Sequence, residues 1–448
     1  MAVSAETQNI NTYLEQFAAL ERRTAGSGGA WIHPLRKAAL ARFAERGFPT
    51  TRDEDWKFTN LAPIAQTAFH LPEAAPLPPA EALQPFLVAG LSGTRLVFVD
   101  GRFAPALSRM ATLPRGVVAG SLAEAMRSLR ALVEPHLTQY ADFTQDAFTA
   151  LNTAFMEDGA FVWLPKGTIL EEPIHILHVS TGGPTPLLTS LRNLIVAQED
   201  SQAAVIEDYV SLADGVALSN VVTEAVVGQN GVLEHYLLER ESRQVTNVST
   251  LRIQQGRSSN VTSHSVLLGG DLVRNNIHPV MAGEGGECLI NGLFLATDRQ
   301  HMDNFMRVEH ASPHCGSRQF YNGVLDGHAH GVFHGRIVVH KDAQKTDAKQ
   351  TNRNLLLSED AQVDTKPQLE IYADDVKCTH GATIGQINED ALFYLRARGL
   401  SRETARALLL FAFANECLQR MRVAPMRRYL EGLVARWIPK ASLLEGLS

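Results

Sequence analysis

Turn-forming residues recur at nearly constant spacing through the second half of this 448-residue chain. Neighbouring turn sites are 13 to 18 residues apart, and short β-rich runs lie between them. The sites are Gly256, Gly269, Gly283, Asp298, Ser312, Gly327, Asp342, Asp360 and Asp374. Such regularity without intervening helical patterns is typical of a stacked array. The phrase Asp342-Ala343-Gln344 recurs as Asp360-Ala361-Gln362, which supports a repeat from coil to coil. Two segments per coil would give coils of about 27–33 residues.

We therefore predict a mainly β fold, in which a right-handed parallel β-helix over residues 156–388 is flanked by N-terminal and C-terminal α-helical regions. A β-sandwich would also show short strands with frequent turns, but the constant spacing and the lack of long excursions favour the solenoid. Stacked coils bury a continuous core. The residues expected in that core include Leu251, Ile253, Val266, Leu289, Leu293 and Val338.

Helical periodicity marks both ends of the chain. We expect residues 1–155 to form a mostly helical domain with a small hairpin at 95–103, and residues 389–448 to form a second helical domain. In the second domain, Ser401 is the expected N-cap of a helix whose run 405–414 is apolar on every side. Such a helix must be covered all round, either by its own domain or by a second protein.

The composition excludes several classes of protein. A net charge of −7 and the lack of any Lys/Arg-rich run argue against nucleic-acid binding. The acidic, polar N-terminal stretch does not have the pattern of a secretion signal. No window approaches the roughly 18 apolar residues that a membrane span needs. Four cysteines in so long a chain indicate reduced thiols, so we expect a cytoplasmic protein.

The stretch 372–385, YADDVKCTHGATIG, places a thiol and an imidazole two residues apart at the end of the β-patterned region. Side chains two apart on a strand share one face, roughly 6.5–7 Å from each other. Cys378 and His380 could therefore hold one metal, or face a partner that completes a site, and the pair suits zinc, copper or iron–sulfur chemistry. The alternative is that Cys378 is a small core residue and His380 caps a turn before Gly381.

Other candidate sites in the sequence carry weaker signals. Seven histidines between residues 301 and 340 either bind metal or line solvated strand faces and loops. The sequence contains no phosphate-binding loop, dinucleotide fingerprint or nucleophile elbow, so we expect no bound nucleotide. Some β-helices are carbohydrate-active enzymes, but those need clustered carboxylates, and the acids here are scattered through turns. We expect no catalytic residues.

Three strings resemble the SufD family, whose members are subunits of the SufB–SufC–SufD iron–sulfur cluster assembly machinery. The strings are IYADDVKCTHGATIG followed by LFYLRARGL, the stretch 338–375, and RDEDWKFT at 52–59. The string DVKCTHGATIG stands where SufB has its own cysteine-bearing interface segment, which argues against SufB itself.

The resemblance implies a non-enzymatic scaffold subunit on which a nascent iron–sulfur cluster is held transiently. It implies pairing with SufB through the β-helix, with His380 as a cluster ligand and Cys378 lining the same interface. It also implies that the SufC ATPase docks on the C-terminal helices, so that ATP hydrolysis belongs to that partner. The docking residues expected on that helix are Leu408, Leu409, Phe411 and Phe413. In isolation, the solenoid end could pair with a second copy as a homodimer.

Overall fold

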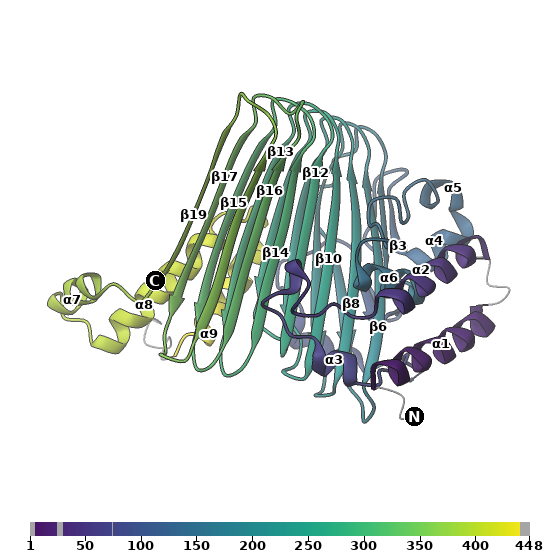
Figure 1. Cartoon of the computed structure of the whole chain (residues 1–448), viewed down its shortest axis with the longest axis horizontal. Coiled ribbons are helices and arrows are strands. Elements are labelled where there is room, and N and C mark those ends of the chain that lie inside the picture. Colours follow the sequence, from purple (N-terminus) through teal and green to yellow (C-terminus); the bar gives the residue numbers. More distant parts are fainter. Residues whose placement is uncertain (1–4, 25–29, 74, 440–448) are drawn as a thin grey trace.

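The computed structural model describes residues 5–24, 30–73 and 75–439. Within these residues, nineteen strands form two long sheets, called sheet I and sheet II below. The chain alternates between the sheets, so that successive coils stack into a solenoid of about eight turns (Figure 1). The predicted parallel β-helix is therefore confirmed. Residues 1–4 and 440–448 of the expected terminal domains lie outside the described residues.

Each sheet takes every second strand of the solenoid. Sheet I contains β1 (Arg95–Val99), β2 (Arg102–Phe103), β5 (Ile174–Ser180), β7 (Gln202–Ser211), β9 (Val232–Arg240), β11 (Asn260–Leu267), β13 (Glu287–Ala296), β15 (Gly316–Leu325), β17 (Asp347–Leu356) and β19 (Lys377–Gly385). Sheet II contains β3 (Val118–Ser121), β4 (Ala160–Leu164), β6 (Leu187–Ala197), β8 (Ala217–Val227), β10 (Val245–Gln255), β12 (Leu272–Met281), β14 (His301–His310), β16 (His330–Val339) and β18 (Gln362–Ile371).

All nine predicted turn sites lie between strands, at the corners of the coils. The corners need left-handed backbone, which Asp and Asn tolerate better than branched residues do. Asp200, Asn230 and Asp298 accordingly have φ of 56°, 56° and 57°. The repeated Asp-Ala-Gln phrase falls at two successive corners of one coil. Its copies are therefore half a coil apart and are not equivalent positions in neighbouring coils.

The predicted core residues divide between the inside and the outside of the coil. Leu251 and Ile253 belong to the interior cluster that runs along the solenoid axis. Val266 and Leu293 are also buried, but they point outward and pack under the C-terminal helices. The remaining two residues also face outward. Val338 is buried, but it alternates with the inward-facing residues of β16 and so lies on the outer face. Leu289 is only half-buried, so its prediction as a core residue was wrong.

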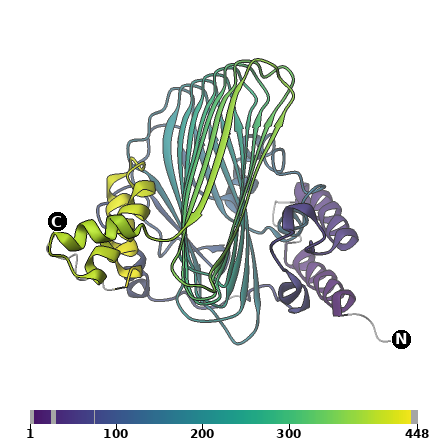
Figure 2. The ribbon, with the colours of Figure 1, turned by 60° about the vertical axis from the view of Figure 1, so that its left-hand side comes forward.

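Helices cover the two sheets from opposite sides (Figure 2). Most of the N-terminal elements pack on the outer face of sheet II, whereas the short helix Ala80–Phe86 packs on β1, β5 and β7 of sheet I. The C-terminal helices pack on the outer face of sheet I. The N-terminal elements are α1 (Ala5–Thr24), η1 (Ala30–Ile32), α2 (His33–Arg46), η2 (Glu54–Trp56), α3 (Ala62–Gln66), η3 (Ala80–Phe86), α4 (Leu122–Ser128), α5 (Arg130–Val133) and α6 (Ala147–Phe155). The C-terminal helices are α7 (Glu389–Ala397), α8 (Arg402–Leu418) and α9 (Ala424–Trp437). Ser401 caps α8 as predicted, because its side chain accepts a hydrogen bond from the Thr404 N–H.

The predicted hairpin forms, and it becomes part of the solenoid. β1 and β2 pair antiparallel across the turn at Asp100-Gly101. β1 also pairs in parallel with β5, so the hairpin extends sheet I at its N-terminal end. β3 extends sheet II at the same end by pairing antiparallel with β4.

The segment 52–59, part of the SufD-like sequence pattern, crosses the outer face of sheet II. The guanidinium of Arg274 on β12 lies over the Trp56 ring, with Cζ 4.3 Å from the ring centroid. Asp55 forms an ion pair of 3.0 Å with Arg336 on β16. The segment therefore ties the N-terminal region to coils that lie far away in the sequence.

Candidate functional site

The C-terminal end of the solenoid is open. Among the described strands, β19 pairs only with β17, and β18 pairs only with β16. Both strands therefore leave one edge of backbone N–H and C=O groups without a strand partner. Three large apolar side chains near this end are exposed: Ile371 by 39%, Tyr372 by 64% and Ile384 by 49%. An unpaired edge with exposed apolar side chains is typical of a protein–protein contact surface.

Cys378 and His380 both lie on β19 and point into the open end of the coil. Their register partners on β17 are Ala348 and Gln350. The Gln350 amide reaches the position of Gly335 on sheet II, so this column of side chains faces the interior. His380 is exposed because no further coil covers it, whereas Cys378 is half-buried. Cys378 packs against a small cluster of buried residues at the end of the coil, formed by Ile337, Val339, Ala343, Ala348 and Ala373.

The Cys378 thiol is protonated at neutral pH in this environment. Burial raises its pKa, and the Ala348 N–H only partly opposes that effect. Since the thiolate is the form that binds metal, ligation would require a metal or a partner's cation to displace the proton.

The chain supplies an incomplete ligand set at this end. Within the part of the chain that the structure describes, no three His, Cys, Asp or Glu side chains are grouped closely enough to hold a metal ion. An iron–sulfur cluster usually has about four protein ligands. Cys378 and His380 could therefore provide part of such a site, and the other ligands would have to come from a second chain.

Two family models match the chain. A model described as the SufBD protein N-terminal region matches residues 4–176. A second model, described as the SufBD core domain of SUF system FeS cluster assembly, matches residues 179–413. The chain belongs to the SufBD family.

Full-length relatives support this assignment. The chain is 34% identical over 408 residues to the iron–sulfur cluster assembly SufBD family protein slr0076 of Synechocystis, covering 89% of this chain and 90% of the relative. It is 31% identical over 408 residues to the iron–sulfur cluster assembly protein SufD of Escherichia coli, covering 91% and 93%. The SufD of Bacillus subtilis is 26% identical over 419 residues, covering 91% and 94%. This SufBD protein is therefore an iron–sulfur cluster assembly protein.

The seven histidines of residues 301–340 are dispersed around the coils of this SufBD protein. His301 and His330 are neighbours on the outer face of sheet II, where their rings meet edge to face with centroids 4.8 Å apart. His310 points inward, where burial lowers its pKa to about 4, and its Nε2 lies 2.9 Å from Ser317 Oγ. Separation by the coil wall explains why close spacing in the sequence does not bring all of these rings together.

The four predicted docking residues lie on α8, which packs against β13 and β15 of sheet I. All four are half-buried: Leu408, Leu409, Phe411 and Phe413. The face of α8 that is fully buried consists of six other residues, namely Ala405, Ala407, Leu410, Ala414, Cys417 and Leu418. The chain therefore covers one face of this apolar helix by itself, while Ala412 on another face is exposed.

A groove and an exposed helix next to α8 were missed by the sequence analysis. The groove, of about 500 Å³, lies between α8 and the end of β19, where Leu409, Phe413 and Ile384 line it. α7 projects from the body beyond β19 (Figure 1). It leaves Phe393 exposed by 72% and Tyr394 by 57%. The adjacent aromatic residues Phe393 and Tyr394 were the signal in the sequence that could have indicated this exposed surface.

None of the described helices is long and apolar enough to cross a membrane.

Proposed function

We propose that this protein is a non-enzymatic scaffold subunit that pairs with SufB and docks the SufC ATPase during iron–sulfur cluster assembly. The observation that carries the proposal is the Cys378–His380 pair on the unpaired terminal strand of the solenoid. This location gives two metal-binding side chains to a surface that a second solenoid can cover. The relatives named SufD support the choice of partners.

In this proposal, the open coil joins the corresponding end of SufB. Strand pairing would satisfy the edges of β18 and β19, and the contact would cover Ile371 and Ile384. The nascent cluster is the cargo of this interface. His380 is proposed as a ligand, and Cys378 lines the same site. Closure of the interface would shield the labile cluster from water. An isolated chain would use the same end to form a homodimer.

The ligand role is tested in the complex of this protein with its SufB and SufC partners, expressed together and reconstituted anaerobically. We expect His380→Ala to lower the cluster content, measured by absorption spectroscopy and iron and sulfide analysis. Thr379→Ala is the matched control, because Thr379 is also exposed but points to the opposite face of β19. Unchanged assembly in the His380→Ala complex would exclude the ligand role.

SufC docking is proposed on α8 and the adjoining groove. The partner would cover Leu408 and Leu409, which the chain itself leaves half-buried. We expect Leu408→Glu to abolish co-purification of SufC while SufB is retained. The control is Leu14→Glu on α1, since Leu14 is 43% exposed and lies outside the docking region. SufC retention by the Leu408→Glu variant would contradict the docking site without affecting the SufB proposal.

A carbohydrate-active β-helix enzyme is not favoured as an alternative. Both family models that match the chain belong to the SufBD family, and together they span residues 4–176 and 179–413.

A further inference from the structure

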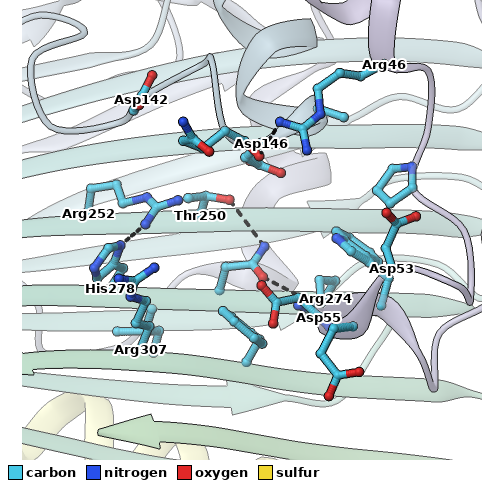
Figure 3. Close-up of a pocket in the computed structure, with 18 of the residues that line it drawn as sticks. Arg46, Asp53, Asp55, Asp142, Asp146, Thr250, Arg252, Arg274, His278 and Arg307 are labelled. Carbon is cyan, nitrogen blue, oxygen red and sulfur yellow. Dashed lines mark hydrogen bonds between the residues drawn. The ribbon is translucent and has the colours of Figure 1, made fainter. Parts of the chain in front are cut away.

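A cavity of about 590 Å³ lies between the N-terminal region and the outer face of sheet II. Figure 3 shows many of the residues that line it. β10, β12 and β14 form its floor, and its walls come from the segment 46–56 and the loop 140–147. Cavities of this size at the junction of two parts of a fold are frequent ligand sites. Cys378 and His380 are not among its lining residues, so it is separate from the open end.

The floor carries basic side chains on three neighbouring strands. Arg252 on β10 and His278 on β12 are register partners, and Arg252 donates a hydrogen bond to His278 Nδ1. His278 Nε2 donates in turn to Glu309 Oε1 at 2.8 Å. The same Glu309 oxygen lies 2.7 Å from Nε of Arg307 on β14. Glu309 therefore contacts His278 and Arg307 directly, whereas Arg252 reaches it only through His278. The other oxygen of Glu309 lies 3.2 Å from His340 Nε2. Like charges on adjacent strands repel each other.

Arg252 is the member of this row that lacks a carboxylate partner. Within the described ranges, no Asp or Glu oxygen lies within 4.0 Å of its guanidinium nitrogens. Its buried Nε has no hydrogen-bond partner there either. A buried donor without a hydrogen-bond partner is unfavourable, because it has lost its hydrogen bonds to water. Burial also lowers the pKa of Arg252, because the cation has lost part of its hydration. A ligand carboxylate would satisfy this group.

Two carboxylates line the wall above Arg252 (Figure 3). Asp142 Oδ1 accepts a hydrogen bond of 2.8 Å from the Thr144 N–H, and Asp146 Oδ2 accepts one of 2.9 Å from the Thr149 N–H. The second oxygen of each carboxylate has no hydrogen-bond donor among the described residues. A simple anion would be attracted by the floor but repelled by this wall, and a simple cation would experience the reverse.

The charge pattern is therefore complementary to a ligand that carries both signs. Apolar side chains also line the cavity: Phe48 and Pro49 lie on the wall formed by residues 46–56, and Phe305 lies on the floor. The cavity therefore presents basic groups to a carboxylate, acidic groups to an ammonium group and apolar side chains to an apolar group.

We propose that this cavity binds a small zwitterion of the amino-acid class with an apolar side chain, either a free amino acid or a dipeptide. Its carboxylate lies on Arg252, with Arg307 as a second donor. Its ammonium group lies between Asp142 and Asp146, and its side chain packs on the apolar side chains of the cavity. This inference does not depend on SufB pairing or on the cluster site.

Isothermal titration calorimetry on the full chain tests the site with L-leucine, glycyl-L-leucine, D-leucine, isovalerate and isopentylamine. Isovalerate retains the carboxylate and the apolar group, whereas isopentylamine retains the amine and the apolar group. We expect one of the two L-zwitterions to bind more tightly than D-leucine and than either singly charged analogue. The tighter of the two distinguishes a free amino acid from a dipeptide as the ligand.

Two variants remove one contact each. Arg252→Gln should weaken binding of the preferred zwitterion by about tenfold or more. Asp142→Asn should also weaken it, and the asparagine retains an oxygen for the Thr144 N–H. Arg318→Gln is the control and should bind normally, because Arg318 is a half-buried arginine on β15 of the other sheet. Thermal unfolding confirms that each variant is folded. Equal binding by isovalerate, unchanged binding by Arg252→Gln, or no heat from any probe would overturn the proposal.

Discussion

Two buried glutamates at one corner of the solenoid, Glu239 and Glu241, have no arginine or lysine as an ion-pair partner within the described residues. Glu239 accepts hydrogen bonds from the Glu241 N–H at 2.8 Å and the Gly269 N–H at 3.1 Å. Glu241 accepts from Ser219 Oγ and Asn247 Nδ2, both at 2.6 Å. Burial raises the pKa of both carboxyl groups, to about 7 for Glu241. The native state therefore favours protonated carboxyl groups at this corner.

The raised pKa of Glu241 predicts a pH-dependent stability. The unfolded chain loses this proton near pH 4.5, whereas the folded chain keeps it until about pH 7. The contribution of Glu241 to the free energy of unfolding is therefore full below pH 4.5. It falls by on the order of 3 kcal/mol as the pH rises to about 7. Glu241→Gln removes this loss, so its free energy of unfolding should rise relative to wild type between pH 5 and pH 8, measured by urea unfolding. Glu199→Gln, at an exposed position, should show no such trend.

On the neighbouring strands β13 and β15, close packing inside the coil makes the residue type at one position depend on the side chain at the next. Gly292 on β13 and Tyr321 on β15 are register partners. The Tyr321 ring lies over the α-carbon of Gly292, and a β-carbon at that position would overlap the ring. Both positions belong to strands whose inner faces line the interior cluster. The glycine therefore provides the space that the fully buried tyrosine occupies.

Gly292→Ala should destabilise the solenoid by about 1–3 kcal/mol, because the added methyl group displaces the Tyr321 ring in a close-packed interior. Denaturant unfolding measures the change. Tyr321→Leu removes the ring that the added methyl group would displace. The double variant should therefore be less destabilised than the sum of the two single changes. Gly381→Ala is the control, since nothing lies within 4 Å of a β-carbon there. Additive effects of the two changes would contradict the proposed contact.

At the scale of the whole molecule, the two helical regions and the open end have complementary roles. Most of the N-terminal elements cover sheet II, and η3 and the C-terminal helices cover sheet I, so both sheets are buried on two faces along much of the solenoid (Figure 2). The C-terminal end of the coil stack has no comparable cover among the described residues. Ile371, Tyr372 and Ile384 are therefore exposed at this end of the stack.

The double change Ile371→Lys and Ile384→Lys should weaken association through the open end, because it places two charges on a surface that must lose water. The chain itself should stay folded, since these side chains are 39% and 49% exposed. Sedimentation velocity measures self-association, and co-purification measures SufB binding. Ile169→Lys is the control, because Ile169 is 61% exposed at a different place. Unaltered association of the double variant would exclude this surface as the interface.

Much of the fold follows from local patterns. Turn chemistry is local, so the nine predicted turn sites all fall at corners. The pairing of Cys378 with His380 on one face follows from strand alternation. Their exposure at the open end was not predictable in the same way, because it depends on β19 being the last strand of sheet I.

The sequence analysis mainly failed to determine which side chains of each strand face the interior of the coil. Strands buried on both faces read as continuous apolar runs, so the pattern does not mark the inner face. Val266 and Leu293 were therefore placed in the interior, although they pack under the C-terminal helices. The cavity above Arg252 was also missed, because its walls come from residues 46–56 and 140–147 and its floor from strands more than a hundred residues later.

The sequence by itself determined the repeat length, the alternation along each strand and the identity of the family, because these depend on residues close together in the chain. The tertiary structure decided which faces are inside, which end is open and which charges meet at the Arg252 cavity. These features arise from contacts between distant segments, where packing and charge neutralisation depend on the arrangement of the whole chain.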